Sequence, residues 1–209
     1  MTNHAGDLDT SFGTGGKVTT YFNDGSSIAN SVVLTSDDKI IVGGLLATGS
    51  DSNNYNYDFV LVKYTANGGL DTTFGSNGIV TTDFNGGRDE AFSVVLTSDN
   101  KIIVGGSTTS TDSNSNMHID FALAKYNNDG RLDANFGNNG IVTTDFNGGR
   151  DKVHSVVLTS DDKIIVGGYA STDSNSNNKD FALAKYNVYG VLDANFGNNG
   201  IVTTDFNGG

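Results

Sequence analysis

The amino-acid sequence predicts an all-β protein built from repeated four-stranded antiparallel units, and three observations lead to this prediction. First, a Leu-Asp-x-x-Phe-Gly motif begins at Leu8, Leu70, Leu132 and Leu192, with spacings of 62, 62 and 60 residues. Second, short β-branched runs separated by polar turns recur between these motifs. Third, no window has the apolar period of 3.6 residues that an amphipathic helix requires. We therefore expect almost no helix.

Each repeat contains four candidate strands, which are clearest in the second repeat. The runs 94–96 and 102–104 flank a polar turn at 98–101, and this pattern predicts a hairpin. Both faces of these strands are apolar, as in strands that are covered on both sides. The third strand is expected at 121–126. The fourth, at 141–146, is the most polar and should form the exposed edge.

Four antiparallel strands with apolar inner members and a polar outer member are typical of a propeller blade. Tandem immunoglobulin-like sandwiches are one alternative, but they need about 100 residues per domain. A β-solenoid is another, although its coils are usually shorter. We expect a β-propeller-type array that forms a single repeat domain over residues 1–209. The repeats lie at about 8–69, 70–131 and 132–191, followed by a partial repeat at 192–209.

Three motifs in fixed order carry a family resemblance. They are Leu-Asp-x-x-Phe-Gly-x-x-Gly-x-Val, then Ser-Val-Val-Leu-x-x-Asp-x-Lys-Ile-Ile-Val-Gly-Gly, then Phe-Ala-Leu-Ala-Lys-Tyr-x-x-x-Gly. Together they resemble the bacterial delta-60 repeat over almost the whole chain. The resemblance implies a β-propeller-like array, often found in secreted or surface proteins. It implies no known catalytic residues.

The strand count predicts an array with open ends. About three blades fit, over residues 31–84, 93–146 and 155–206, and one strand at 17–22 is left over at the N-terminus. Closed propellers usually have 4–8 blades. Either a longer chain supplies the missing strands, or another copy of the molecule does. We expect a homo-oligomer or a filament, because open blade faces and unpaired edges recruit further chains.

Composition excludes several classes of partner and site. Asp and Glu number 24 against 12 Lys and Arg, so the net charge is −12. This balance argues against nucleic acid and against anionic membrane surfaces as partners. The chain has no cysteine, which excludes disulfides and thiolate metal sites. No apolar run is long enough to insert into a membrane, and no signal peptide is visible.

The loops between the second and third strands are candidate calcium sites. Oxygen ligands at alternate positions suit Ca²⁺, which takes 6–8 oxygens. The loop of the second repeat offers Asp112, Asn114, Asn116 and Asp120. The loop of the third repeat offers Asp173, Asn175, Asn177 and Asp180. The alternative interpretation is a polar, solvated hairpin loop, because Asn, Ser and Asp are common in loops.

Other polar residues favour structure over catalysis. The motif aspartates Asp9, Asp71, Asp133 and Asp193 recur once per repeat, whereas a catalytic site needs a unique constellation. We interpret them as turn-fixing carboxylates. The histidines share no repeat position, with His118 expected in a loop and His154 before a first strand. We therefore expect no enzyme.

The expected function is that of a structural or adhesive repeat protein, extracellular or on a cell surface, that assembles with itself. The alternative is a propeller module that binds a glycan or a protein. Only Tyr55, Tyr57 and Tyr169 break the symmetry of the repeats in a way that suggests a ligand.

Overall fold

The computed structural model describes residues 5–22, 25–48, 56–84, 86–111, 113, 117–146, 148–171 and 178–206. These residues contain twelve β-strands and no helix. The strands form three sheets of four consecutive strands each. Their bounds are β1 Ser27–Leu34, β2 Ile40–Ala47, β3 Tyr57–Tyr64, β4 Ile79–Thr82, β5 Asp89–Leu96, β6 Ile102–Thr111, β7 Met117–Tyr126, β8 Ile141–Thr144, β9 Lys152–Leu158, β10 Ile164–Ser171, β11 Lys179–Tyr186 and β12 Ile201–Thr204.

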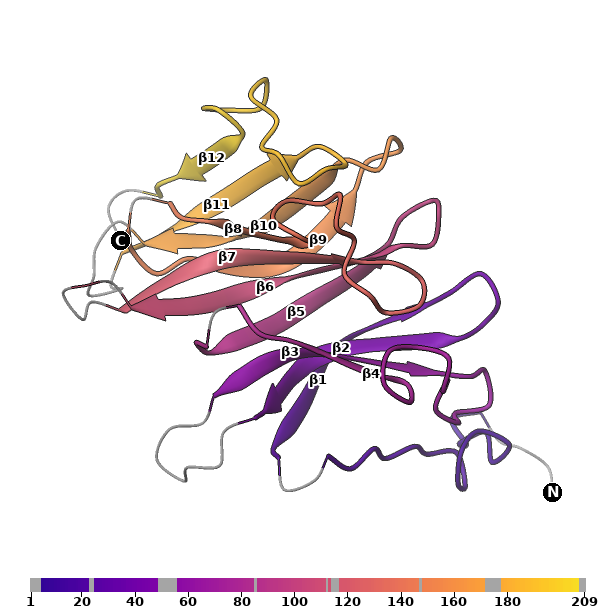
Figure 1. Cartoon of the computed structure of the whole chain (residues 1–209). Helices are drawn as coiled ribbons and strands as arrows, with labels where there is room; N and C mark the ends of the chain where they lie inside the picture. Colours follow the sequence, from indigo (N-terminus) through magenta and orange to yellow (C-terminus); the bar gives the residue numbers. More distant parts are fainter. Residues whose placement is uncertain are drawn as a thin grey trace.

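Each sheet is an antiparallel meander, which we call blade 1 (β1–β4), blade 2 (β5–β8) and blade 3 (β9–β12). The blades stack on one another in chain order (Figure 1). The short fourth strands β4, β8 and β12 lie at the edges of their sheets. The predictions of an all-β fold, of four-stranded blades and of polar edge strands are therefore confirmed.

The turn between the first two strands of a blade shows how the sequence sets the fold locally. In blade 2, Asn100 adopts a positive φ of 62°, a conformation that Asn tolerates better than most residues. The hydroxyl of Thr97 accepts a hydrogen bond from the amide of Lys101 at 2.9 Å and donates one to Asp99. The predicted polar hairpin turn is thus held by its own side chains.

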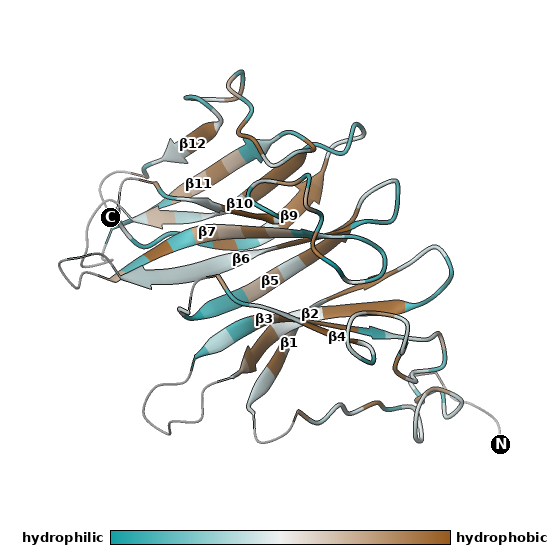
Figure 2. Ribbon diagram, viewed as in Figure 1, coloured by the Kyte–Doolittle hydropathy of each residue, from teal (hydrophilic) through white to brown (hydrophobic). Residues whose placement is uncertain are grey.

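The cores lie between the blades. One buried cluster joins blades 1 and 2 around Phe59, Leu61 and Val94, and another joins blades 2 and 3 around Phe121 and Val156. Blade 2 is covered on both sides, so successive residues along β6 are buried whichever way they point. Figure 2 shows apolar residues along the strands and polar residues in the turns.

The first strand of each blade begins five residues before its apolar run in blades 1 and 2, and four residues before it in blade 3. A register shift interrupts each of these strands, between Ala29 and Ser31 in β1 and between Ala91 and Ser93 in β5. The extra residue breaks the alternation that marks a strand in the sequence. In β9 the corresponding residue is His154, which lies within the strand and not before it.

The N-terminal segment, residues 8–22, takes the place that the end of a preceding blade would have. Phe22 packs against Leu46, Val60 and Val62 of blade 1. Residues 18–22 are not a regular strand, because no third strand of a preceding blade lies beside them to pair with. The leftover strand expected at 17–22 is therefore present in position but has no ladder of hydrogen bonds.

Candidate functional site

The blades are joined by a contact that recurs at both junctions. The side chain of Val94 lies over Gly43, and a β-carbon on that glycine would be 2.3 Å from Val94 Cγ2. At the second junction Val156 lies over Gly105, with a corresponding distance of 2.2 Å. Only glycine leaves room for such a close approach. The valine is a knob, and the glycine of the preceding blade is the hole that receives it.

Two hydrogen bonds accompany each knob. The amide of Val94 donates to Ser31 Oγ at 3.0 Å, and the amide of Val156 donates to Ser93 Oγ at 3.1 Å. Near the fourth strand of the preceding blade, a buried tyrosine hydroxyl forms a hydrogen bond with a threonine. Tyr126 meets Thr82 at 2.7 Å in this way. Burial raises the pKa of the Tyr126 hydroxyl, so it stays protonated.

The C-terminal face of blade 3 carries the same residues without a neighbour to cover them. Phe181 and Phe206 are each 67% exposed, whereas their counterparts Phe121 and Phe146 in blade 2 are each 1% exposed. Gly167 is the hole of this face, and among the described residues a β-carbon there would meet only Leu183 of the same blade. The face lines an apolar concavity of about 420 Å³.

The N-terminal face of blade 1 carries the matching knob. Val32 is 62% exposed, whereas Val94 and Val156 at the same repeat position are each 3% exposed. Ile28 and Leu34 on the same strand are also exposed. Strand β1, at the lower end of the stack in Figure 2, shows this apolar character. The molecule therefore ends in an uncovered hole on one side and an uncovered knob on the other.

The N-terminal segment covers the other part of the face of blade 1. Thr20 bonds the Tyr64 hydroxyl at 2.6 Å, as Thr82 does with Tyr126. The amide of Gly13 donates to the carbonyl of Asn67 at 2.9 Å, the same contact that the equivalent glycines make between blades. The segment thus imitates the outer part of a preceding blade, and β1 stays uncovered.

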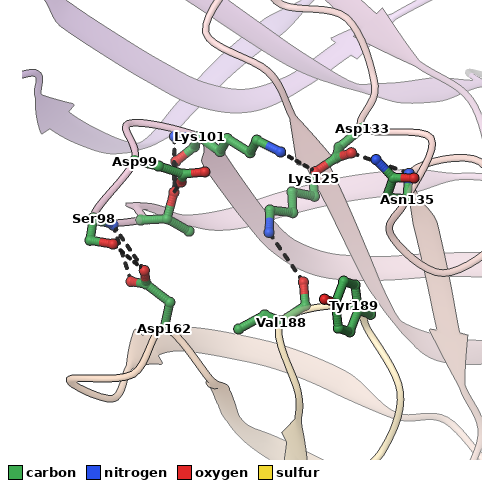
Figure 3. A pocket seen from close by; sticks show the side chains of 10 residues that line it. Ser98, Asp99, Lys101, Lys125, Asp133, Asn135, Asp162, Val188 and Tyr189 are labelled. Carbon is green, nitrogen blue, oxygen red and sulfur yellow. Dashed lines mark hydrogen bonds and ion pairs between the residues drawn. The ribbon is translucent and has the colours of Figure 1, made fainter.

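A polar pocket lies between blades 2 and 3 (Figure 3). Lys101 pairs with Asp133 at 2.8 Å, and the Lys125 ammonium donates to the carbonyl of Val188 at 3.1 Å. The pair of Lys39 and Asp71, at 3.1 Å, repeats the first contact one blade earlier. Both ion pairs lie within one blade, while the bond from Lys125 reaches the next blade, and we interpret the arrangement as one that serves blade packing.

The motif aspartates fix turns, which is the role expected of them. Asp71 accepts hydrogen bonds from the amide and the hydroxyl of Thr73, at 3.2 and 2.6 Å. Asp133 accepts one from the amide of Asn135 at 3.2 Å. The hydroxyl bond from Thr73 is the main reason why the pKa of Asp71 lies below its ordinary value.

Two groups of three aspartates lie at the opposite ends of the same junctions. Junction cluster 1 is Asp58, Asp83 and Asp89, and junction cluster 2 is Asp120, Asp145 and Asp151. In each cluster, one oxygen from every carboxylate lies within 4.8 Å of the others. The third strand of one blade supplies the first aspartate, the residue directly after its fourth strand supplies the second, and the start of the next blade supplies the third.

Burial dominates the electrostatics of these clusters. The pKa of Asp89 and that of Asp151 are raised to about 6, mainly by burial and in smaller part by the neighbouring carboxylates. The pKa values of Asp58 and Asp120 are raised as well, chiefly by burial. Three carboxylates in a partly buried site repel one another when ionised, because burial lowers the local dielectric constant.

Most of the predicted calcium loop lies outside the described residues. This applies to six of the eight proposed ligands: Asp112, Asn114, Asn116, Asp173, Asn175 and Asn177. Asp120 lies in β7 and belongs to junction cluster 2, while Asp180 lies in β11. The structure therefore places Asp120 with Asp145 and Asp151.

The residues that break the repeat symmetry have packing partners. Arg88 stacks on Tyr57 at 4.3 Å, and Lys179 lies 4.6 Å from the ring of Tyr169. Tyr55 lies outside the described residues. His118, expected in a loop, lies in β7, where its Nδ1 is 3.0 Å from the carbonyl oxygen of Gly148.

The sequence pattern did not mark Asp83, Asp89, Asp145 and Asp151 as possible ligands. The signal was present, since carboxylates recur at three fixed positions of the repeat. In a four-stranded meander, the start of the third strand and the end of the fourth lie at the same end of the sheet. The start of the next blade follows there directly, so the three positions converge.

Comparison with known families agrees with this architecture. A family model described as "Domain of unknown function (DUF5122) beta-propeller" matches residues 35–74, 97–136 and 159–196. These segments together make up more than half of the chain, and the match confirms the resemblance to delta-60 repeats. A search of curated proteins found no match. Among the described residues, no helix is long and apolar enough to cross a membrane.

Proposed function

Because the chain belongs to the DUF5122 beta-propeller repeat family, we propose that it is a non-enzymatic structural module that joins end to end with a second copy of itself. The observation that carries the proposal is the complementarity of the two end faces. Val32 is the exposed knob, and Gly167 is the uncovered hole. Within the chain, the same two positions meet at each blade junction.

Backbone and side-chain groups support the same docking. Ser155 stands where Ser31 and Ser93 accept the amide of the following blade, so it can accept the amide of Val32 from a second copy. Phe181 and Phe206 would then be covered as Phe121 and Phe146 are. Burying large apolar side chains of this kind stabilises association by roughly 1.5–3 kcal/mol each before the cost of ordering.

The N-terminal segment has to move for this docking to be complete. Thr20 occupies the place at Tyr64 that Thr204 of an incoming copy would take, because Thr20 stands at the repeat position where Thr204 ends β12. The segment therefore competes with the second copy. We expect removal of residues 1–22 to tighten the association.

The experiment is sedimentation velocity or light scattering on the 209-residue chain over a range of concentrations. The proposal predicts species larger than 21.8 kDa that grow with concentration. Val32→Glu and Gly167→Val should each shift the chain toward the monomer, one by charging the knob and the other by filling the hole.

Val191→Glu is the matched control, because Val191 is also exposed but follows a turn that packs against blade 2 and not at the free end of blade 3. The same repeat position holds Arg131 in blade 2, where a charge remains solvated. A single monomeric species at every concentration would overturn the proposal. So would association that responds equally to Val32→Glu and to Val191→Glu.

A further inference from the structure

Each junction cluster contains a buried carboxylate oxygen that has no partner. Asp58 is only 8% exposed, and its Oδ1 atom is buried without a hydrogen bond. The Oδ1 atom of Asp120 has the same environment at the second junction. A buried polar atom without a partner is costly and calls for an explanation in terms of an ion or water. The unpartnered oxygen occurs at the same repeat position at both junctions, so it is a feature of the repeat.

The other oxygens of the clusters are held in place. In junction cluster 1, Asp89 accepts hydrogen bonds from the hydroxyl of Thr108 at 2.6 Å and from the amide of Phe84 at 2.7 Å. Asp83 accepts one from the amide of Gly86 at 2.5 Å. Because a carboxylate oxygen has two lone pairs, each of these atoms can still bind a cation.

Junction cluster 2 is built in the same way. Asp151 accepts hydrogen bonds from the amides of Phe146 and Ser171, at 2.7 and 3.2 Å. Asp145 accepts one from the amide of Gly148 at 2.6 Å. The backbone thus fixes two of the three carboxylates at each junction, and the sites are organised before any ligand arrives.

No basic side chain of the described residues neutralises these carboxylates by an ion pair. The nearby Arg88 and Lys152 both pair with Glu90, at 2.6 and 2.7 Å. Arg150 precedes Asp151 in the chain, but its Nε atom has no hydrogen-bond partner. Within the part of the chain that the structure describes, no ion pair therefore balances the charge of the clusters, although the nearby His118 acts to lower the pKa of Asp120.

We propose that junction clusters 1 and 2 each bind one divalent cation of the hard, oxygen-preferring class, with Ca²⁺ as the favoured ion. All the ligands are carboxylate oxygens, and calcium accepts irregular sets of such oxygens, completed by water. Histidine is not a shared ligand of the two sites, because Asn56 stands in the repeat where His118 stands near junction cluster 2. The bound ion ties the start of one blade to the last two strands of the blade before it.

The repeat predicts two ions per chain and not three. Asp180 and Asp205 of blade 3 stand at the repeat positions of the first two ligands, and the third would come from a following blade. Blade 1 has Ser27 at that third position. A junction between two copies would therefore lack one carboxylate, so the calcium sites do not depend on the proposed association.

The test is calorimetric titration of the chelator-treated, full-length chain with CaCl₂ and, in parallel, with MgCl₂, together with the melting temperature in each salt. We expect two calcium ions per chain, with a Kd of roughly 10⁻⁴ M, and a melting temperature that rises with calcium. The variant Asp58→Asn/Asp120→Asn should weaken calcium binding at least tenfold. Asparagine keeps the shape of aspartate and relieves repulsion, so this variant should fold, and circular dichroism checks that it does.

The control variant is Asp112→Ala/Asp173→Ala, which alters only the predicted loop sites and should keep both ions. The proposal would be overturned if the titration with CaCl₂ gave no heat of binding, or if calcium left the melting temperature unchanged. Calcium binding that survives in Asp58→Asn/Asp120→Asn and is lost in the loop variant would also overturn it, and would assign the ion to the loops. Tighter binding of magnesium than of calcium would contradict the choice of ion.

Discussion

Val94 of blade 2 fills the space over Gly43 of blade 1, and no β-carbon could occupy that glycine without moving the valine. Val156 and Gly105 repeat this relationship at the next junction. Gly167 has the same place in blade 3, but no residue of the described part of the chain lies over it as Val94 lies over Gly43. The three glycines thus allow one substitution to be tested in covered and uncovered versions of a single site.

The first prediction compares Gly105→Ala with Gly167→Ala. The new methyl group at Gly105 would lie 2.2 Å from Val156 Cγ2, and we expect the free energy of unfolding to fall by about 2 kcal/mol. At Gly167 the nearest atom is 3.3 Å away, so the change should be within about 1 kcal/mol of neutral. Urea denaturation at low protein concentration measures both. Equal losses in the two variants would contradict the knob-and-hole description.

The second prediction concerns the tyrosine hydroxyls between the blades. Tyr126→Phe should cost about 1 kcal/mol, because it leaves the buried hydroxyl of Thr82 without its partner. Tyr64→Phe is the matched control, since its partner Thr20 lies in the partly exposed N-terminal segment and can turn to water. Denaturation curves of the two variants should therefore differ, and a larger loss for Tyr64→Phe would contradict the expectation.

The third prediction uses the pKa of Asp71, which hydrogen bonds from Thr73 and the ammonium of Lys39 hold below its ordinary value near 3.8. A carboxyl with a lowered pKa stabilises the folded state above its unfolded pKa, and this stabilisation is lost as the pH falls through the folded pKa. Asp71→Asn should therefore cost about 1 kcal/mol near pH 7 and progressively less below about pH 4.

Unfolding free energies of the wild type and Asp71→Asn, measured across this pH range, provide the check. Lys39→Gln serves as the control, because it removes the ammonium and keeps the Thr73 bonds. Its effect should also shrink at low pH. A difference between wild type and Asp71→Asn that stays constant with pH would show that the charge of Asp71 contributes nothing.

The fourth prediction concerns salt. The net charge of −12 opposes the approach of two copies, whereas the proposed contact is apolar. Salt screens the repulsion and leaves the apolar contact intact, so association should strengthen between about 0.05 and 0.5 M NaCl. Sedimentation at fixed protein concentration measures this. Dissociation with rising salt would indicate a contact held by ion pairs.

The periodic sequence was sufficient to predict the blades, their strand order and their polar edges. The polar turn that contains Asn100 was also predictable, because the hydrogen bonds that hold it are made by side chains close together in the sequence. The starts of the first strands were predicted too late, since the register shift beside Ala29 and Ala91 hides the alternation. The junction clusters could not be read from a single loop, because their ligands come from two blades and meet only after the sheets stack.

Because every junction uses the same knob and hole, an array of this kind can have any number of blades. Removing or adding one whole repeat would leave the same hole at one end and the same knob at the other, since each blade offers both. Stability then grows as a sum over blades and their junctions. Duplication or loss of a gene segment encoding about 62 residues would therefore change the size of the protein without creating a surface that it did not already have.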